Sequence, residues 1–357
     1  MKLIAALISL FLIIPAYAEP VLPQGFSLKP FAYIPNVRTM AGAPELGVIF
    51  AGTRDSSIYA VIDKNQDAQA EDVRLLHSDL NVPNGLAWKD GYLYVTEQHR
   101  LTRYNVGDKL PEKWPEPEVL YDGLPDKRWH GWRYSTFGPD GALYVSVGAP
   151  CNICWPRNLE GTILRFDPQT WMPTIFARGV RNSVGLDFNP ITNELFFTDN
   201  GADNMGDDIP PDELNHAPRA GLHFGYPYFG GGQSRTSDFT EETPPFNQRP
   251  VQTYQAHVAP LGIEFYTGGR FPDHYKNGLF VNQHGSWNRS IPVGYRVSFH
   301  PVDAQGNIGK EEDFLSGFLS HDRHVSARPV DLEEWADGRM LISDDYEGII
   351  YLLDYQE

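Results

Sequence analysis

A short strand pattern recurs six times along this chain of 357 residues. Each copy begins with a small or apolar lead-in, followed by a turn and a strand rich in Leu, Tyr, Val or Phe. Most copies then continue through a polar loop into another strand, whereas long segments with apolar residues at helical spacing are absent from the sequence. The copies are residues 41–62, 85–104, 134–147 with 161–166, 185–198, 262–281 with 294–299, and 330–352.

Six small antiparallel sheets cannot each bury both faces alone, but radial packing buries them against one another. The sequence therefore predicts an all-β fold, a six-bladed β-propeller, as a single domain over residues 19–357. Long loops at 105–129, 148–160 and 199–258 account for the uneven spacing, and loops on one face of a rigid scaffold commonly carry the functional site. A pair of β-sandwiches is the rival architecture.

The first residues have the pattern of a secretory signal peptide. Met1 and Lys2 give a positive start, residues 3–15 are apolar without a charge, and Ala16-Tyr17-Ala18 has the small-x-small form of a cleavage site. The apolar run is shorter than the roughly 20 residues that span a bilayer, so we expect cleavage after Ala18 rather than a membrane anchor. The mature chain is expected to be periplasmic or secreted, with no membrane span.

Charge and cysteine content narrow the classes of partner. The formal net charge of −17 argues against nucleic acid and anionic membranes, and is compatible with cations and neutral substrates. Cys151 and Cys154 are the two cysteines, and a local disulfide is the prediction for an exported chain. Trp155, not His, follows Cys154, which excludes c-type haem attachment, and two thiols cannot complete a zinc site. A thioredoxin-like redox pair is the alternative.

The segment 199–215 is unusually acidic. Hard cations prefer oxygen ligands, so this segment indicates a calcium site, although its spacing is not that of an EF-hand. The alternative is a solvated acidic loop. Its carboxylates are Asp199, Asp203, Asp207, Asp208, Asp212 and Glu213, and glycines at 201 and 206 allow carbonyl groups to turn inward.

Basic and polar residues occupy matching strand ends in three of the repeats. In a propeller such positions converge at the mouth of the central channel, where guanidinium groups suit an anionic ligand. Trp287 is suited to cover a planar ring. The alternative is that each arginine caps a loop or pairs with a local acid. The residues are Arg181, Asn182, His284, Trp287, Arg289 and Arg328.

His130 lies between two tryptophans, Trp129 and Trp132, just before the third repeat. A histidine at a blade mouth is a candidate general base near neutral pH, with a purely structural role as the alternative. The sequence has no GxSxG elbow and no Gly-rich phosphate loop followed by a helix. This argues against a nicotinamide enzyme of the Rossmann type.

In their order and spacing, these motifs resemble the pyrroloquinoline quinone (PQQ)-dependent glucose/sorbosone dehydrogenase family, especially its L-sorbosone dehydrogenase-like branch and the soluble aldose sugar dehydrogenases. The resemblance covers nearly the whole mature chain. It implies a six-bladed propeller that holds PQQ in its central channel with a calcium ion at the edge. The motifs are residues 130–141, 149–154, 178–186, 198–215, 284–290, 294–295, 328–330 and 343–345.

The resemblance also implies roles for individual residues. His130 matches the catalytic base that takes the proton of the substrate hydroxyl while hydride passes to the quinone. Arg181 matches the arginine near the reacting carbonyl, and Asn182 its neighbour on the cofactor. Arg328 matches an arginine that binds a cofactor carboxylate, and His284 falls near a basic cofactor contact.

For the metal, Gly201 and Ala202 match positions that offer backbone carbonyls to calcium, with Asp203 and Asp208 nearby in the acidic loop. Trp287 and Arg289 share the loop of His284 and are further candidates for cofactor contact. The implied activity is PQQ- and calcium-dependent oxidation of a sugar or sugar aldehyde, with electrons passed to an external acceptor. A calcium-dependent, lactonase-like hydrolase and a non-enzymatic binding propeller remain as alternatives.

Three positions depart from the glucose-type pattern of the family. Ala149 stands where a carboxylate is expected to orient the catalytic histidine, which leaves the strength of that base in doubt. Val184 replaces a polar cofactor contact, and Ser326 replaces a second arginine.

Overall fold

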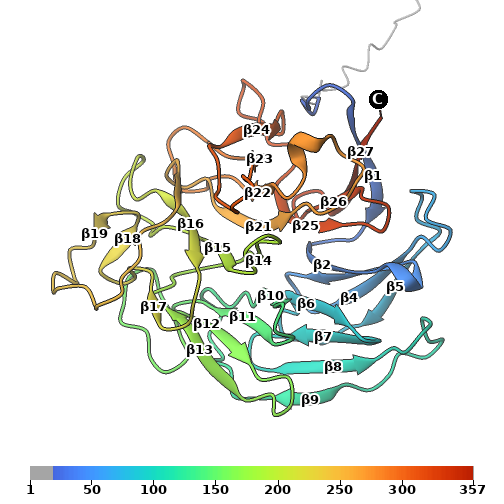
Figure 1. Ribbon diagram of the computed structural model, residues 1–357, viewed down its shortest axis with the longest axis horizontal. Helices are drawn as coiled ribbons and strands as arrows, with labels where there is room; N and C mark the ends of the chain where they lie inside the picture. The colour runs from blue at the N-terminus through green and yellow to red at the C-terminus, as the bar shows by residue number, and fades with distance from the viewer. Residues whose placement is uncertain (1–18, 357) are drawn as a thin grey trace, which may run out of the picture.

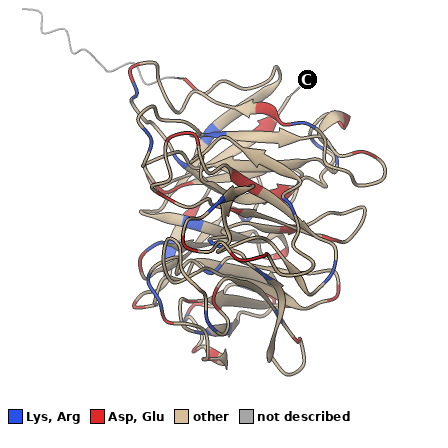
Figure 2. Ribbon diagram, turned by 90° about the vertical axis from the view of Figure 1, so that its left-hand side faces the viewer, with Lys and Arg blue, Asp and Glu red and all other residues tan. Residues whose placement is uncertain are grey.

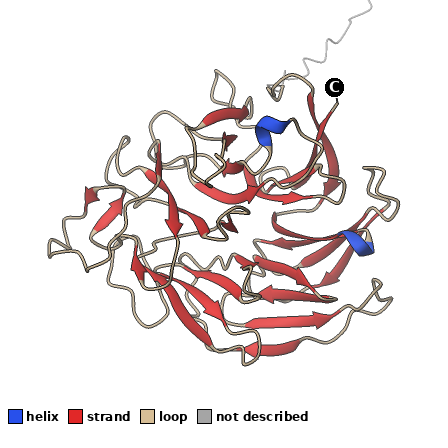
Figure 3. Cartoon of the chain, viewed as in Figure 1, coloured by secondary structure: helices blue, strands red, loops and turns tan. Residues whose placement is uncertain are grey.

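A computed structural model describes residues 19–356, and they form a closed ring of six blades around a central channel (Figure 1). Five of the blades are four-stranded antiparallel sheets, and the third gains a short parallel fifth strand. Strands and loops make up nearly all of the described chain (Figure 3). The six-bladed all-β prediction is confirmed. The predicted signal peptide, residues 1–18, lies outside the described residues.

Each blade runs outward from the channel, and apart from β1 and β17 the strands of a blade come in chain order. The first three blades consist of β2 (Val37–Ala43), β3 (Val48–Thr53), β4 (Ile58–Ile62) and β5 (Asp72–His77); β6 (Gly85–Lys89), β7 (Tyr92–Thr96), β8 (Leu101–Asn105) and β9 (Glu118–Tyr121); and β10 (Ser135–Phe137), β11 (Leu143–Val147), β12 (Thr162–Phe166), β13 (Pro173–Arg178) and β17 (Leu222–His223).

The remaining blades and two short 3-10 turns complete the ring. They consist of β14 (Leu186–Phe188), β15 (Leu195–Asp199), β16 (Asp212–Ala217) and β20 (Gln252–Tyr254); β21 (Pro260–Phe265), β22 (Leu279–Gln283), β23 (Arg296–His300) and β24 (Glu312–Leu315); β25 (Pro329–Glu334), β26 (Met340–Asp344), β27 (Ile349–Tyr355) and β1 (Phe26–Tyr33); a separate hairpin of β18 (Phe229–Gly231) and β19 (Ser234–Arg235); and η1 (Pro44–Leu46) and η2 (Asp273–Tyr275).

The N-terminal strand closes the ring. Strand β1 pairs antiparallel with β27, so residues from both ends of the described chain share the sixth blade. Phe26 anchors this strand by edge contacts with Phe271 and Phe314 of the neighbouring blade, at centroid distances of 4.9 and 5.0 Å. The repeat pattern in the sequence did not reveal this strand, because β1 stands apart from its own blade along the chain.

Glycines let the blades approach one another closely near the channel. A Cβ on Gly85, the first residue of β6, would lie 2.0 Å from the carbonyl oxygen of Arg133. A Cβ on Gly185, just before β14, would lie 2.0 Å from the carbonyl oxygen of Leu261. Because such contacts are impossible for any other residue, these glycines fix how tightly the innermost strands pack.

Carboxylates inside the channel bind the innermost strands to one another. Asp187 of β14 accepts the N–H of Phe265 in β21 at 2.7 Å. Asp331 of β25 accepts the N–H of Met40 in β2 at 2.8 Å. Strands β2 and β25 are joined again where Glu333 accepts the N–H of Gly42, also at 2.8 Å, so the acids reinforce the closure of the ring.

Asp187 and Glu333 border a channel cavity of about 190 Å³ to which all six innermost strands contribute residues. Burial raises the pKa of Asp331 to about 7. Burial and the neighbouring carboxylates also raise the pKa values of Asp187, Glu264 and Glu333. The acids favour the folded state most when they are protonated. Elsewhere, Lys, Arg, Asp and Glu are interspersed on loops at both faces of the ring (Figure 2).

We therefore expect the free energy of unfolding to fall as pH rises from about 5 to 8. Folded-state pKa values above the ordinary value near 4 mean that stability is fully present below pH 4 and is lost as these acids ionise. Glu333→Gln keeps an acceptor for Gly42 and should flatten the decline by up to about 1.4 kcal/mol per pH unit. Urea unfolding at pH 5.5 and 8 measures this, and an unchanged slope contradicts it.

Candidate functional site

Loops that lead into or out of the blades bring the predicted residues to one end of the channel. His130 precedes β10, Arg181 precedes β14, Arg328 precedes β25 and His284 follows β22. A cavity of about 200 Å³ lies between blades three, four and five. Its lining residues are Trp129, His130, Arg181, Asn182, Asn200, Gly201, Asp203, Asp212, His257, Ala259, Trp287 and Asn288.

Six of the predicted residues therefore share this cavity, namely His130, Arg181, Asn182, Gly201, Asp203 and Trp287. The other five do not line it: Ala202, Asp208, His284, Arg289 and Arg328. Trp287 is 72% exposed and Trp129 is 53% exposed. The cavity thus has an aromatic rim and a polar interior.

His130 is held as a neutral histidine with one free nitrogen. Its Nδ1 lies 2.9 Å from the carbonyl oxygen of Ala149, which as an acceptor requires the proton on Nδ1. Its Nε2 is then unprotonated. Burial, followed by the charge of Arg181, holds the pKa of His130 well below its ordinary value. A main-chain carbonyl thus takes the place of the carboxylate missing at Ala149.

The backbone around His130 is also constrained. His130 has a φ of +50°, in the left-handed region that side chains other than glycine seldom adopt. The neighbouring strand end offers it room because position 148 is glycine, where a Cβ would lie 2.5 Å from the Cβ of His130. Strain of this kind is concentrated at functional sites in proteins.

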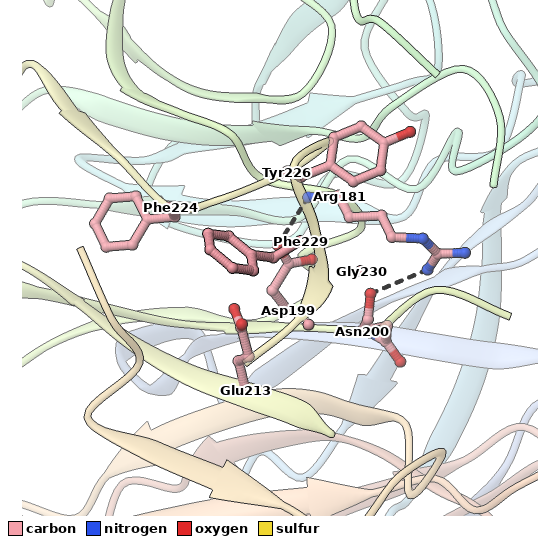
Figure 4. A pocket seen from close by; sticks show the side chains of 10 residues that line it. Arg181, Asp199, Asn200, Glu213, Phe224, Tyr226, Phe229 and Gly230 are labelled. Carbon is pink, nitrogen blue, oxygen red and sulfur yellow. Dashed lines mark hydrogen bonds between the residues drawn. The ribbon is translucent and has the colours of Figure 1, made fainter. Parts of the chain in front are cut away.

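Arg181 ties three loops together through its guanidinium group. Its Nε donates to the carbonyl oxygen of Asn152 at 3.0 Å, and Nη2 donates to Asn152 Oδ1 at 2.7 Å. Nη2 also pairs with Asp203 at 3.0 Å, and Nη1 donates to the carbonyl oxygen of Asn200 at 3.0 Å, as Figure 4 shows. Arg181 is therefore a rigid wall of the cavity, and Asp203 balances its charge.

The predicted disulfide between Cys151 and Cys154 is present. The backbone N–H of Cys154 donates to the hydroxyl of Tyr226 at 2.8 Å. Between the cysteines lies Asn152, whose Oδ1 accepts from Arg181 and from the N–H of Asp203 at 2.8 Å. The disulfide loop therefore supplies the partner that joins Arg181 to the acidic loop.

Two acids of the segment 199–215 shape its turns. Asp199 accepts the N–H groups of Arg181 and Asn182 at 2.7 and 2.6 Å. Asp212 accepts those of Gly201 and Ala259 at 2.6 and 2.8 Å. Burial raises the pKa of Asp199 to about 7 and that of Asp212 to about 6.

Asp199 also borders a small pocket behind Arg181, together with Glu213 and three aromatic side chains (Figure 4). Burial raises the pKa of Glu213 to about 8. No basic side chain other than Arg181 lines this pocket. Glu213 is therefore, after Asp199, a second acid beside the cavity whose pKa burial raises to near neutral pH.

The acidic loop does not gather carboxylates around a metal position. Asp208 pairs with Arg289 at 2.8 Å, so these two predicted residues neutralise each other. Across residues 19–356, no cluster of three or more His, Cys, Asp or Glu side chains is placed to hold a metal ion. Within that range, the carbonyl oxygens of Gly201 and Ala202 accept no hydrogen bond, so oxygen donors of the kind that calcium prefers remain available there.

Arg328 retains an unbalanced charge. Its Nε and Nη2 donate to the carbonyl oxygens of His284 and Gly285 at 3.1 and 2.6 Å. Its backbone N–H donates to Asp344 at 2.7 Å, but its guanidinium group has no carboxylate partner among the described residues. His284 differs, because burial lowers its pKa to about 4 and its Nε2 lies 2.8 Å from Asp345.

Sequence reasoning missed several residues that support this site. Asn152, Asn200 and Asp345 lie within the motifs at 149–154, 198–215 and 343–345, but no individual role was predicted for them. Asp199 was counted only as a possible metal ligand, whereas it anchors the turn of Arg181. A carboxylate at the end of a buried strand was the available signal.

The sequence matches a family model and several known proteins. The family model described as TrAA12-like matches residues 213–356. An uncharacterized protein of Borreliella burgdorferi is 35% identical over 350 residues, covering 94% of this chain and 90% of that protein. A pyrroloquinoline quinone-dependent sugar dehydrogenase of Hypocrea jecorina is 25% identical over 50% of this chain and 48% of that protein.

The fold has close counterparts as well. The calcium structure of the Trichoderma reesei Carbohydrate-Active Enzymes Family AA12 protein aligns with a TM-score of 0.81 at 20% identity, covering 96% of this chain and 98% of that one. The chain thus has the same fold as that AA12 structure, a six-bladed propeller. The chain belongs to the PQQ-dependent sugar dehydrogenase family. Among residues 19–356, no helix has the length and apolar character needed to cross a bilayer.

Asn152→Ala should destabilise the protein by about 1–3 kcal/mol, because Arg181 Nη2 and the N–H of Asp203 lose the side-chain oxygen that both donate to. Urea unfolding of the variant and the wild type measures the difference. Asn65→Ala is the matched control, since Asn65 makes an exposed contact with Asp67 and should change stability by less than about 0.5 kcal/mol. An equal loss of stability in Asn152→Ala and Asn65→Ala would contradict the role assigned to Asn152.

Proposed function

We propose that this protein is a PQQ-dependent oxidoreductase that oxidises a sugar or sugar aldehyde, with His130 as general base. The observation that carries the proposal is the free Nε2 of His130 in the same cavity as Arg181 and Asn182. That nitrogen is unprotonated at neutral pH because the pKa of His130 is depressed. Membership of the PQQ-dependent sugar dehydrogenase family supports the same reaction class.

The residues at the channel mouth fit a planar, tricarboxylate quinone. Arg328 has a guanidinium charge without an acid partner, and arginine binds carboxylates in bidentate fashion. Asn182 lines the cavity beside His130, and the exposed ring of Trp287 is available to cover a planar ligand. His284 and Arg289 are less suited to binding an anion, since His284 is neutral and Arg289 is paired with Asp208.

When bound, the quinone supplies a carbon that accepts hydride. His130 takes the proton from the hydroxyl group of the substrate, or from the hydrated form of an aldehyde, at Nε2. The Ala149 carbonyl keeps the imidazole in the required tautomer and orientation. Arg181 cannot reorient freely, because its guanidinium group makes four hydrogen bonds, so it forms a fixed wall of the cavity that also contains His130.

Calcium is proposed as a further cofactor at the carbonyl groups of Gly201 and Ala202, with Asp203 as the nearest carboxylate in sequence. Backbone carbonyls are suitable calcium ligands. A cation there would act as a Lewis acid at the site. The pairing of Asp208 with Arg289 favours a role for Asp208 in holding the loop rather than in binding the metal.

Export by the predicted signal peptide would place the enzyme outside the cytoplasm, with PQQ bound after or during folding. The chain carries no haem-attachment motif. We therefore propose that electrons leave the reduced site to a separate acceptor molecule that reaches the channel mouth.

The test is reconstitution of purified apoprotein with PQQ and Ca²⁺, followed by dye reduction with sugars. His130→Ala should lower kcat about 10²- to 10⁴-fold and leave the Kd for PQQ within about two-fold. His274→Ala is the control, because His274 lies on the surface and pairs with Glu312. Full activity of His130→Ala would exclude the assigned base. Substrate hydrolysis without PQQ would favour a lactonase instead.

The pH profile tests the tautomer of His130. Because its pKa is lowered, the base form persists to lower pH, so kcat/KM should decline only below pH 6.5, the ordinary value for histidine. Ala149→Asp would place a carboxylate beside His130 and should shift this decline to higher pH. Both profiles are measured with saturating PQQ. Identical profiles for the two proteins would mean that position 149 does not control the base.

A further inference from the structure

A buried carboxylate at the channel mouth is shared by three basic side chains. Asp345 follows β26 in the sixth blade, and its side chain is 2% exposed. Its Oδ2 lies 2.9 Å from Arg38 Nη1 and 3.4 Å from Arg54 Nη1, while its Oδ1 lies 2.8 Å from His284 Nε2. Arg38 and Arg54 both come from the first blade.

This cluster has an excess positive charge. Because burial lowers the pKa of His284 to about 4, His284 is neutral at physiological pH. One carboxylate therefore serves two guanidinium groups. Arg38 is 5% exposed and holds the shorter ion pair, whereas Arg54 is 45% exposed and reaches Asp345 only at 3.4 Å. Arg54 is the member of the cluster that can bind an additional anion.

Arg54 faces a cavity that adjoins the site of His130. The cavity measures about 560 Å³, within the range of ligand pockets. The guanidinium groups of Arg38 and Arg54 lie 4.6 and 5.7 Å from the ring centroid of Trp132. Trp132 lines this cavity and lies two residues after His130, so the cavity and the catalytic histidine share one loop.

The same cluster is continuous with Arg328. The carbonyl oxygen of His284 accepts from Arg328 Nε, and the side chain of His284 contacts Asp345. A chain of contacts therefore runs from Arg328 through His284 and Asp345 to Arg38 and Arg54. Near its start, position 326 holds a serine whose hydroxyl bonds the carbonyl oxygen of Phe318 at 3.4 Å, so that position offers no cation.

We propose that Arg54, held in place by Asp345 and the ring of Trp132, binds a carboxylate group of the quinone cofactor. Arg54 of the first blade would then supply the positive charge that is missing at position 326, where serine replaces a second arginine. The inference rests on the proposed function. The chemistry recognised is a carboxylate, and a sugar acid is the other molecule that could present one. Arg54 is linked to Arg328 through Asp345 and His284. This link favours the cofactor, because a molecule with several carboxylates would bind Arg54 and Arg328 at the same time.

The experiment measures PQQ binding to the apoprotein by quenching of tryptophan fluorescence, with Ca²⁺ present, so that no turnover is needed. Arg54→Gln should raise the Kd for PQQ about ten- to hundred-fold, the effect of losing one charge-assisted hydrogen bond. The Kd for PQQ of Arg54→Lys should fall between those of Arg54→Gln and the wild type. Arg74→Gln is the matched control, since Arg74 is 42% exposed, lies on β5 of the same blade and has the single acid partner Asp72.

A Kd for Arg54→Gln equal to that of the wild type and of Arg74→Gln overturns the inference. If that Kd is unchanged while KM rises for sugar acids but not for neutral sugars, the carboxylate belongs to the substrate. Failure of the wild type to bind PQQ overturns the proposed function and this inference together. Binding by the wild type with no effect of Arg54→Gln overturns this inference alone.

Discussion

Hydrogen bonds from main-chain N–H groups to buried carboxylates hold this ring together at its centre. Asp187 and Asp331 join innermost strands of neighbouring blades across the channel wall. Each such bond satisfies a backbone donor in a place that water reaches poorly, where an unpaired donor would cost about 1–3 kcal/mol. The blades can then approach to the distance that glycines such as Gly85 permit. The position of every loop at the channel mouth depends on this frame.

The site uses the same type of bond. Asp199 holds the turn of Arg181 and Asn182, and Asp344 holds the start of the loop that carries Arg328. A number of the acids in this chain are therefore structural, although their abundance suggests a surface made for cations. Once these turns are fixed, a single carbonyl group selects the tautomer of His130, and the disulfide loop and the acidic loop together fix the orientation of Arg181.

The sequence was sufficient to predict the number of blades, because each inner repeat carries its own turn and its own alternating strand. It also brought His130, Arg181 and Asn182 together correctly, since loops before innermost strands converge in any propeller. It could not reveal β1 as the last strand of the sixth blade, because that pairing has no local signal. Nor could it show that the carbonyl oxygen of Ala149 orients His130, since every residue has a carbonyl and only geometry selects one.

The pairing of β1 with β27 also governs the order of folding. Phe26 meets Tyr355, roughly 330 residues further along the chain, and contacts of such high sequence separation slow folding. During synthesis, the other five blades can assemble while the sixth still lacks a strand. The channel mouth acquires its final shape only after the C-terminal strand emerges, so ligand capture there follows completion of the polypeptide.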